Sequence, residues 1–277
     1  MNLTMQLDKR LTVFFLLFAI LPFPLPGQST GSGQSPVDQL IEQLALEQQL
    51  GKAPENIRMQ FEQNPLNLAA DKNELMLELF SDAYRSDRLL EDFKTALQQR
   101  LSSQQINKIT NTLGSPPIQH VTEAHKEFYS LQGKRKRIVT QYEMEQQPPA
   151  PERVEIIQTL VDTTSAAAGS VESSIVILRS VIKALGNLSA QHSFTDQQID
   201  AVAANFRTQM QAGASQQTHD QLMITYYNVD INTLESYLAL MQSETGQLLD
   251  QAIGKSMYTA YERASDRFLE AVSTQSN

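Results

Sequence analysis

Apolar residues recur along this chain at intervals of three and four, which is the spacing of one face of an α-helix. No stretch shows the sustained alternation of Val, Ile, Thr and aromatic residues that a half-buried β-strand needs. The pattern therefore predicts an all-α protein. The stretch "SSIVILRSVIKAL" is apolar nearly all round and predicts a central helix. The longest helical ranges predicted are 36–50, 72–99, 152–185 and 244–272.

Several helix starts carry capping signals. Ser102 precedes Gln105 by three positions in "LSSQQI", and Thr195 precedes Gln198 in the same way in "FTDQQI". In such a capping box the hydroxyl accepts a first-turn amide, and the glutamine accepts the amide of the cap residue. Asp230 in "VDINTL" is predicted to cap a further helix. Helices are therefore expected directly after these three cap residues.

Residues 102–124 and 230–252 align without a gap, and both read as a capped helix, a tight turn and a second helix. Their apolar positions agree better than their identities do. We interpret them as parts of two divergent copies of one helical unit. The identical pairs are Ser115 with Ser243, Gln119 with Gln247, and Ala124 with Ala252.

A proline-rich break separates the two copies. The segment "EQQPPAPE" lies near the middle of the chain, and no proline follows Pro151. We expect a first helical unit over 36–145, a proline linker over 146–151 and a second unit over 152–277, packed together as an irregular helical bundle.

Gly246 lies in the first turn of the last predicted helix, where glycine costs roughly 1 kcal/mol relative to alanine. We expect Ser115 and Ser243 to cap the second helix of each pair, and Pro116 to suit the first helical position, where no amide is needed. The glycine then predicts close packing against the preceding helix, with Ile118 at the matching place in the first copy. From helix propensity alone, Gly246→Ala is expected to stabilise by somewhat less than ~1 kcal/mol.

This turn resembles the signature of the periplasmic family called domain of unknown function 2059, in which a Ser-Pro-x-Gly-Gln/Lys turn leads into a long final helix. The resemblance is strongest over 216–272 and implies an exported helical domain with no established activity to transfer. Each copy departs from the signature at one position: Ile118 replaces the glycine, and Glu244 replaces the proline. The matching residues are Ser115, Pro116 and Gln119 in the first copy and Ser243, Gly246 and Gln247 in the second.

The N-terminus has the pattern of a secretory signal peptide. Lys9 and Arg10 precede an apolar run over 11–21 that is shorter than the ~20 residues of a membrane-spanning helix. Helix-breaking prolines follow. We expect a signal peptide over 1–27 and a flexible leader over 28–35, with an uncleaved N-terminal anchor as the alternative. An exported chain without cysteine fits the periplasm of a Gram-negative bacterium, and no stable membrane anchor is expected after cleavage.

The charge balance limits the partners. The formal net charge is −9, whereas nucleic-acid binding requires clustered positive charge. We therefore expect no nucleic-acid partner. The basic cluster formed by Lys134, Arg135, Lys136 and Arg137 is interpreted as a solvated helix face, with contact to an acidic partner or to lipopolysaccharide phosphate as the alternative.

No catalytic, metal or cofactor site is expected. His120, Glu123 and Glu127 lie at helical spacing, but the paired Glu-x-x-His sets of a di-metal bundle are absent, so a solvated polar face is favoured. His192 and His219 are predicted to lie in loops. In "TYYN", Tyr226 and Tyr227 are predicted to pack in the core, with contact to a partner as the alternative.

The sequence thus favours a non-enzymatic interaction protein of the periplasm that contacts another periplasmic or envelope protein. One alternative is a small-ligand binder or enzyme with a pocket between the two units. A third is a peripheral membrane or cell-wall factor that uses the basic cluster. A large apolar-lined cleft with convergent histidine or carboxylate groups would favour the pocket, whereas exposed apolar stripes without such a cleft would favour the interaction protein.

Overall fold

A computed structural model of the chain describes residues 35–50, 55, 58–59, 61–62, 68–188 and 194–275. Over these residues the chain forms twelve helices and no strand, which confirms the all-α helical bundle. The first six are α2 (Pro36–Gln43), α3 (Leu46–Leu50), α5 (Ala70–Ala83), α6 (Ser86–Arg100), α7 (Ser103–Leu113) and α8 (Pro116–Tyr129). The last six are α9 (Leu131–Gln146), α10 (Pro151–Thr163), α11 (Ala166–Leu188), α12 (Asp196–Tyr226), α13 (Ile231–Gln242) and α14 (Glu244–Gln275).

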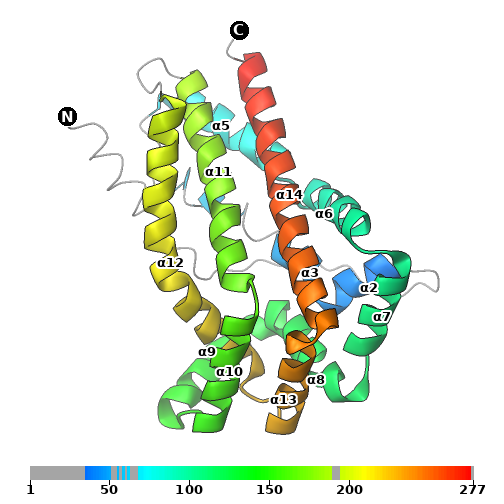
Figure 1. Ribbon diagram of the computed structural model, residues 1–277. Coiled ribbons are helices and arrows are strands. Elements are labelled where there is room, and N and C mark those ends of the chain that lie inside the picture. The colour runs from blue at the N-terminus through cyan, green and yellow to red at the C-terminus, as the bar shows by residue number, and fades with distance from the viewer. Residues whose placement is uncertain are drawn as a thin grey trace.

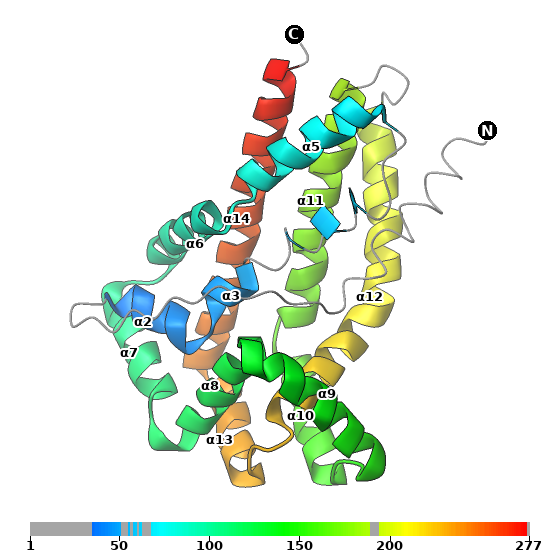
Figure 2. The ribbon, with the colours of Figure 1, turned by 180° about the vertical axis from the view of Figure 1, so that it is seen from behind.

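Three long helices dominate the molecule. Figure 1 shows α12, α11 and α14 standing side by side, with the C-terminus at the upper end of α14. Helices α5 and α6 pack against α14, while α8, α10 and α13 gather at the lower end. Seen from behind, α2, α3 and α7 lie on the α6 side, and α9 lies at the lower end of the molecule together with α10 and α13 (Figure 2).

Helix α11 is the central helix that its apolar pattern predicted. It packs against both α12 and α14. Its buried positions run all round the helix because it has a neighbour on more than one side. The buried apolar residues of α11 are Val171, Ile175, Ile177, Leu178, Val181, Ile182, Ala184, Leu185 and Leu188.

The predicted capping signals are confirmed. Capping boxes are complete at Ser102 and at Thr195, and in each the serine or threonine hydroxyl accepts the amide three residues later. Asp230 caps α13 by accepting the amide of Thr233 at 2.9 Å. Hydrogen bonding lowers the pKa of the Asp230 carboxyl, first through the Thr233 hydroxyl and then through this amide. These starts depend on contacts within four residues, so the sequence contains all the information they need.

Three of the predicted helices are each divided in two, so their continuity was predicted wrongly. The range 36–50 breaks at Leu44 and Ala45, where Ala45 has a positive φ of 50°. The range 72–99 breaks at Tyr84 and Arg85. The Tyr84 ring stacks on Phe80, and its hydroxyl lies 3.1 Å from the Ser180 hydroxyl of α11 and 2.6 Å from the Ser265 hydroxyl of α14.

The range 152–185 breaks at Thr164 and Ser165, between α10 and α11. The amide of Ser165 donates to both carboxylate oxygens of Asp250 on α14, at 3.1 and 3.0 Å. A side chain 85 positions away thus satisfies an amide at this helix start.

Among the described residues, no single helix is long and apolar enough to cross a membrane. Helices α10 and α11, which are bent by 47° relative to each other, reach the required length and apolar composition only when taken as a pair.

The larger hydrophobic core joins residues from both expected units. Phe80, on α5, and Phe93, on α6, lie in the same buried cluster as Leu178 and Phe268. A smaller cluster at the lower end includes Val121 from α8 together with Ile157, Tyr226 and Leu234. The helices before and after the proline segment are therefore packed against one another through shared cores.

Candidate functional site

The turn between α13 and α14 is built around Gly246. Ser243 alone connects the two helices, and its hydroxyl accepts the Gly246 amide at 3.2 Å and donates to the Leu240 carbonyl at 2.6 Å. A Cβ added to Gly246 would lie 2.2 Å from the Leu240 carbonyl oxygen and 2.6 Å from the Met241 Cα. The predicted close packing is therefore confirmed, and it is a contact of backbone with backbone.

The same corner recurs between α8 and α9, which the sequence comparison did not find. Ser130 alone joins these helices, accepts the Gly133 amide at 3.0 Å and donates to the Glu127 carbonyl at 2.7 Å. A Cβ on Gly133 would lie 2.0 Å from that carbonyl oxygen. The shared sequence is Ser-x-x-Gly, so this short pattern was the signal that could have located both corners.

The first copy of the expected repeat differs from the second at its turn. Ser115 occupies the cap position of α8, but its hydroxyl makes no capping bond and donates to the Thr112 carbonyl at 2.6 Å. The prediction that Ser115 caps through its side chain is therefore wrong. Gly114 and Ser115 together connect α7 to α8, and the side chain of Ile118, at the place that matches Gly246, is buried in the core. Pro116 begins α8, as predicted.

The two glutamines of the turn motif also act differently. The Gln247 amide donates to the Met241 carbonyl at 3.1 Å and so ties α14 back to α13. The Gln119 amide donates to the Glu123 carboxylate at 2.9 Å within its own helix. Gln247 therefore serves its turn, whereas the Gln119 contact lies along the exposed surface of α8.

In the basic cluster at residues 134–137, some side chains contact α8 and others face solvent. The Lys136 ammonium pairs with the Glu127 carboxylate of α8 at 2.8 Å. The Arg137 guanidinium lies 4.7 Å from the centre of the Phe128 ring and donates to the Phe128 carbonyl. Burial lowers the pKa of Arg137. Arg135 is exposed. Lys136 and Arg137 thus fasten α9 to α8, and only part of the cluster faces outward.

A cleft of about 580 Å³ lies where α8 and α9 meet the end of α12. His120, Glu123 and Glu127, which share one face of α8 as their spacing predicted, line it together with Lys136 and Arg137. His120 Nδ1 lies 3.3 Å from a Glu123 carboxylate oxygen, and both side chains are exposed. The two glutamates of the cleft are therefore both engaged, Glu123 with His120 and Glu127 with Lys136, in contact with solvent.

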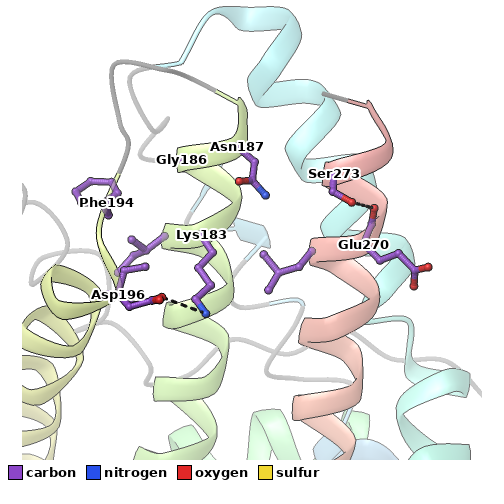
Figure 3. A pocket seen from close by; sticks show the side chains of 10 residues that line it. Lys183, Gly186, Asn187, Phe194, Asp196, Glu270 and Ser273 are labelled. Carbon is purple, nitrogen blue, oxygen red and sulfur yellow. Dashed lines mark hydrogen bonds and ion pairs between the residues drawn. The ribbon is translucent and has the colours of Figure 1, made fainter. Parts of the chain in front are cut away.

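A second cleft of about 640 Å³ lies at the opposite end, between α11, the start of α12 and α14. Figure 3 shows Lys183 and Asp196 pointing toward each other, with Glu270 on α14 pointing away from them. The Lys183 ammonium and the Asp196 carboxylate are 3.7 Å apart and exposed. Among the described residues, no three His, Cys, Asp or Glu side chains converge as metal ligands, here or elsewhere.

His125 is a half-buried residue beside the smaller core that the sequence reasoning did not single out. Its Nδ1 lies 3.0 Å from the Tyr226 hydroxyl, and its Nε2 lies 3.3 Å from the Gln49 side-chain nitrogen. Tyr226 is buried in the smaller core, as predicted, and burial raises its pKa well above the usual value. Because His125 follows the buried Val121 by four positions, helical spacing alone placed it on the inner face.

The remaining histidines are placed as follows. His219 lies within α12, so its prediction as a loop residue is wrong. The pattern "GASQQTHDQ" lacks a strong apolar stripe, but the long helix continues through it because Ala214, near its start, and Met223, just beyond its end, are buried. His192 lies outside the described residues, as do the predicted signal peptide and most of the leader.

The outer face of α9 exposes four large apolar side chains. The exposed fractions are 57 % for Leu131, 73 % for Ile138, 53 % for Val139 and 63 % for Tyr142. In the rest of the described chain, the most exposed large apolar side chains are Val154 and Tyr258, with exposed fractions of 38 % and 39 %, and both are less exposed than these four. A concentration of this kind on one helix is typical of a surface that another molecule covers.

Comparison of the chain with protein-family models, with curated proteins and with solved structures gave no match. The resemblance to the family called domain of unknown function 2059 stays a prediction. The turns, the two clefts and the exposed face of α9 therefore have only their own geometry as evidence of function.

Proposed function

We propose that this chain is an exported, non-enzymatic interaction protein of the bacterial periplasm and a divergent member of the family called domain of unknown function 2059. The outer face of α9 is its contact surface. The observation that carries this proposal is the exposure of Leu131, Ile138, Val139 and Tyr142 on that helix. Burial of these side chains against a partner would remove apolar surface from water, the main favourable term in protein association.

The test of the contact surface is cross-linking in the cell. A photo-reactive amino acid at Ile138 is expected to give a discrete adduct with a protein chain in the native host. The control is the same amino acid at Tyr258, which is exposed on α14 away from this face, and it is expected to give none. If Ile138 gives no adduct at native expression levels, the proposed contact surface is wrong.

The proposed location has a separate test. Lys9 and Arg10 before a short apolar run support cleavage of the signal peptide. The mature protein is expected to begin near Gln28 and to appear in the osmotic-shock fraction. N-terminal sequencing of the protein expressed from its own gene checks this, and intact Met1 recovered in the membrane pellet would contradict it.

A small-ligand binder is the second candidate, because the α8–α9–α12 cleft is of ligand size. The cleft also lies between helices of the two expected units. If it holds a ligand, metabolites carried by the purified protein should be lost in Arg137→Gln, and mass spectrometry of the denatured protein would detect them. Within the cleft the Glu123 carboxylate is hydrogen-bonded to His120 and the Glu127 carboxylate is paired with Lys136, which favours the interaction protein.

A further inference from the structure

The charges of α9 are arranged opposite to what an isolated helix prefers. Basic residues 134–137 lie in its N-terminal half, and Glu143 and Glu145 lie near its C-terminal end. Its first turn has no acidic residue and its last turn has no basic residue. The helix dipole favours acidic groups near the N-terminus and basic groups near the C-terminus. Both ends of α9 therefore lack the charge that would stabilise them.

The exposed residues of α9 also follow the spacing of a helix-pairing seam. Leu131, Arg135, Ile138, Tyr142 and Glu145 are separated by four, three, four and three positions, and all five are exposed. A spacing that averages 3.5 residues keeps one stripe facing a partner helix along its whole length. The seam has an apolar centre at Ile138, a basic residue on one side and an acidic residue on the other.

We propose that the outer face of α9 pairs with the same face of a second copy of this chain, with the two α9 helices antiparallel. A two-fold axis at Ile138 places Ile138 against its own copy, Arg135 over the Tyr142 ring of the other chain, and the basic half of each helix beside the acidic half of the other. A guanidinium over a tyrosine ring is a favourable cation–π contact. This inference rests on the proposed function, since it names the partner of the α9 face.

The antiparallel direction follows from the charges. In a parallel pair, Arg135 would face Arg135 and Glu145 would face Glu145, and like charges brought together destabilise an interface. In an antiparallel pair, each helix end also receives from its neighbour the charge that its own dipole favours. The charge order of α9 is thus self-complementary in one direction only.

The predicted dimer is of modest strength. α9 has 16 residues, so the shared seam is about 24 Å long, shorter than the contact in a standard-size interface. Each chain carries a formal charge of −9, so repulsion between the two bodies opposes pairing at low salt. We therefore expect a reversible dimer that is detectable between about 1 and 200 µM protein, because interfaces of this size are weak.

The absence of cysteine allows a clean test by disulfide trapping. In the purified protein, Ile138→Cys is expected to form a covalent dimer under mild oxidation, because the axis brings the two cysteines together. Leu131→Cys alone is expected not to do so, since the antiparallel pair holds the two positions about 21 Å apart, beyond disulfide reach. A mixture of Leu131→Cys with Glu145→Cys is expected to give the mixed disulfide. Tyr258→Cys is the control for random collision.

A charge exchange tests the same geometry without cross-linking. One variant carries Lys134→Glu and Arg135→Glu, and the other carries Glu143→Lys and Glu145→Lys. In sedimentation velocity, each variant alone is expected to have a dimer dissociation constant raised at least tenfold. An equal mixture is expected to regain most of the lost affinity, because opposite charges then face each other at both ends and one of the two contacts between Arg135 and Tyr142 is kept.

Each result supports or overturns the proposal. A wild-type chain that stays monomeric throughout that concentration range overturns it, as does efficient trapping of Leu131→Cys with itself. A monomer that sediments with vesicles of phosphatidylethanolamine and phosphatidylglycerol would assign the face to lipid instead. If the photo-reactive residue at Ile138 then captures a different chain in cells, the proposed function stands without self-pairing. If it captures nothing, both proposals fail.

Discussion

At Gly246, tertiary geometry reverses the effect that helix propensity predicts. Gly246→Ala is expected to destabilise the protein by about 1–3 kcal/mol, because the added Cβ would meet the Leu240 carbonyl at 2.2 Å and the backbone must shift. Propensity alone would have given a gain of up to ~1 kcal/mol. Urea unfolding measures the difference. Gly246→Leu is expected to cost more than Gly246→Ala.

Gly213 provides the matched control for that substitution. It lies in the middle of α12, and a Cβ there would meet nothing within 4 Å. Gly213→Ala is therefore expected to stabilise by up to ~1 kcal/mol, the full effect of helix propensity. If both glycine-to-alanine variants shift the unfolding midpoint in the same direction, close packing does not explain Gly246.

Asp92 ties α6 to α14 through two arginines. Its carboxylate lies 3.2 Å from Arg263 and 2.5 Å from Arg267, and only 15 % of its side chain is exposed. Arg267 also donates to the last carbonyl of α5, that of Ala83, at 3.1 Å. We expect Asp92→Asn to lower the free energy of unfolding by about 1–3 kcal/mol, because two charge-assisted hydrogen bonds weaken together.

An exposed ion pair provides the comparison for Asp92. Asp200 lies 2.6 Å from Arg179, and 60 % of its side chain is exposed. Solvent screens such a pair, so Asp200→Asn is expected to change stability by less than ~1 kcal/mol. Thermal unfolding of both variants measures the contrast. Equal losses would mean that the Asp92 contacts are screened as fully as those of Asp200.

At the scale of the elements, Ser243 and Ser115 are expected to contribute differently to the free energy of unfolding. Ser243→Ala removes the hydroxyl that accepts a first-turn amide of α14 and should cost about 1 kcal/mol. Ser115→Ala should cost less, because the Ser115 hydroxyl caps no amide of α8. Both serines donate to a carbonyl three residues earlier, so the difference between the variants isolates the capping bond. Chemical denaturation is the measurement, and a larger loss for Ser115→Ala would contradict the assignment.

At the scale of the whole molecule, buried tyrosines predict unfolding in alkali. Burial raises the pKa of Tyr84 to about 12, and burial also raises the pKa of Tyr261. Above a pH of about 10, the usual tyrosine pKa, the unfolded chain loses these protons while the folded chain retains them. The contribution of these tyrosines to the free energy of unfolding is therefore fully present below a pH of about 10. It is lost as the pH rises through their folded pKa values.

Circular dichroism and tyrosinate absorbance, followed together, measure this effect. The loss of helix and the ionisation of the buried tyrosines are expected to occur in one cooperative step. Tyr84→Phe removes one of the groups, so its free energy of unfolding should decline less over the same pH interval, whatever its stability at neutral pH. Ionisation of all tyrosines with the helices intact would show that the rings are accessible to solvent.

The sequence by itself determined the class of fold and the points where many helices begin. Spacing of three and four excludes a half-buried sheet, and caps such as Ser102, Thr195 and Asp230 act on amides within the next few residues. The all-round apolar pattern of α11 was sufficient to place it centrally. Each of these features depends on neighbours along the chain, so a linear pattern contains them.

Only the tertiary structure decided where the long apolar stretches break and which polar residues meet. The helix break at Ser165 has the carboxylate of Asp250 as its partner, and the break at Tyr84 places its hydroxyl beside Ser180 and Ser265. The exposed seam of α9 likewise appears only when α8 and α12 have covered the opposite side of that helix. Asp250, Ser180, Ser265 and α12 lie tens of residues or more away in the chain from the residues they contact, and a local pattern contains no information about contacts at such separations.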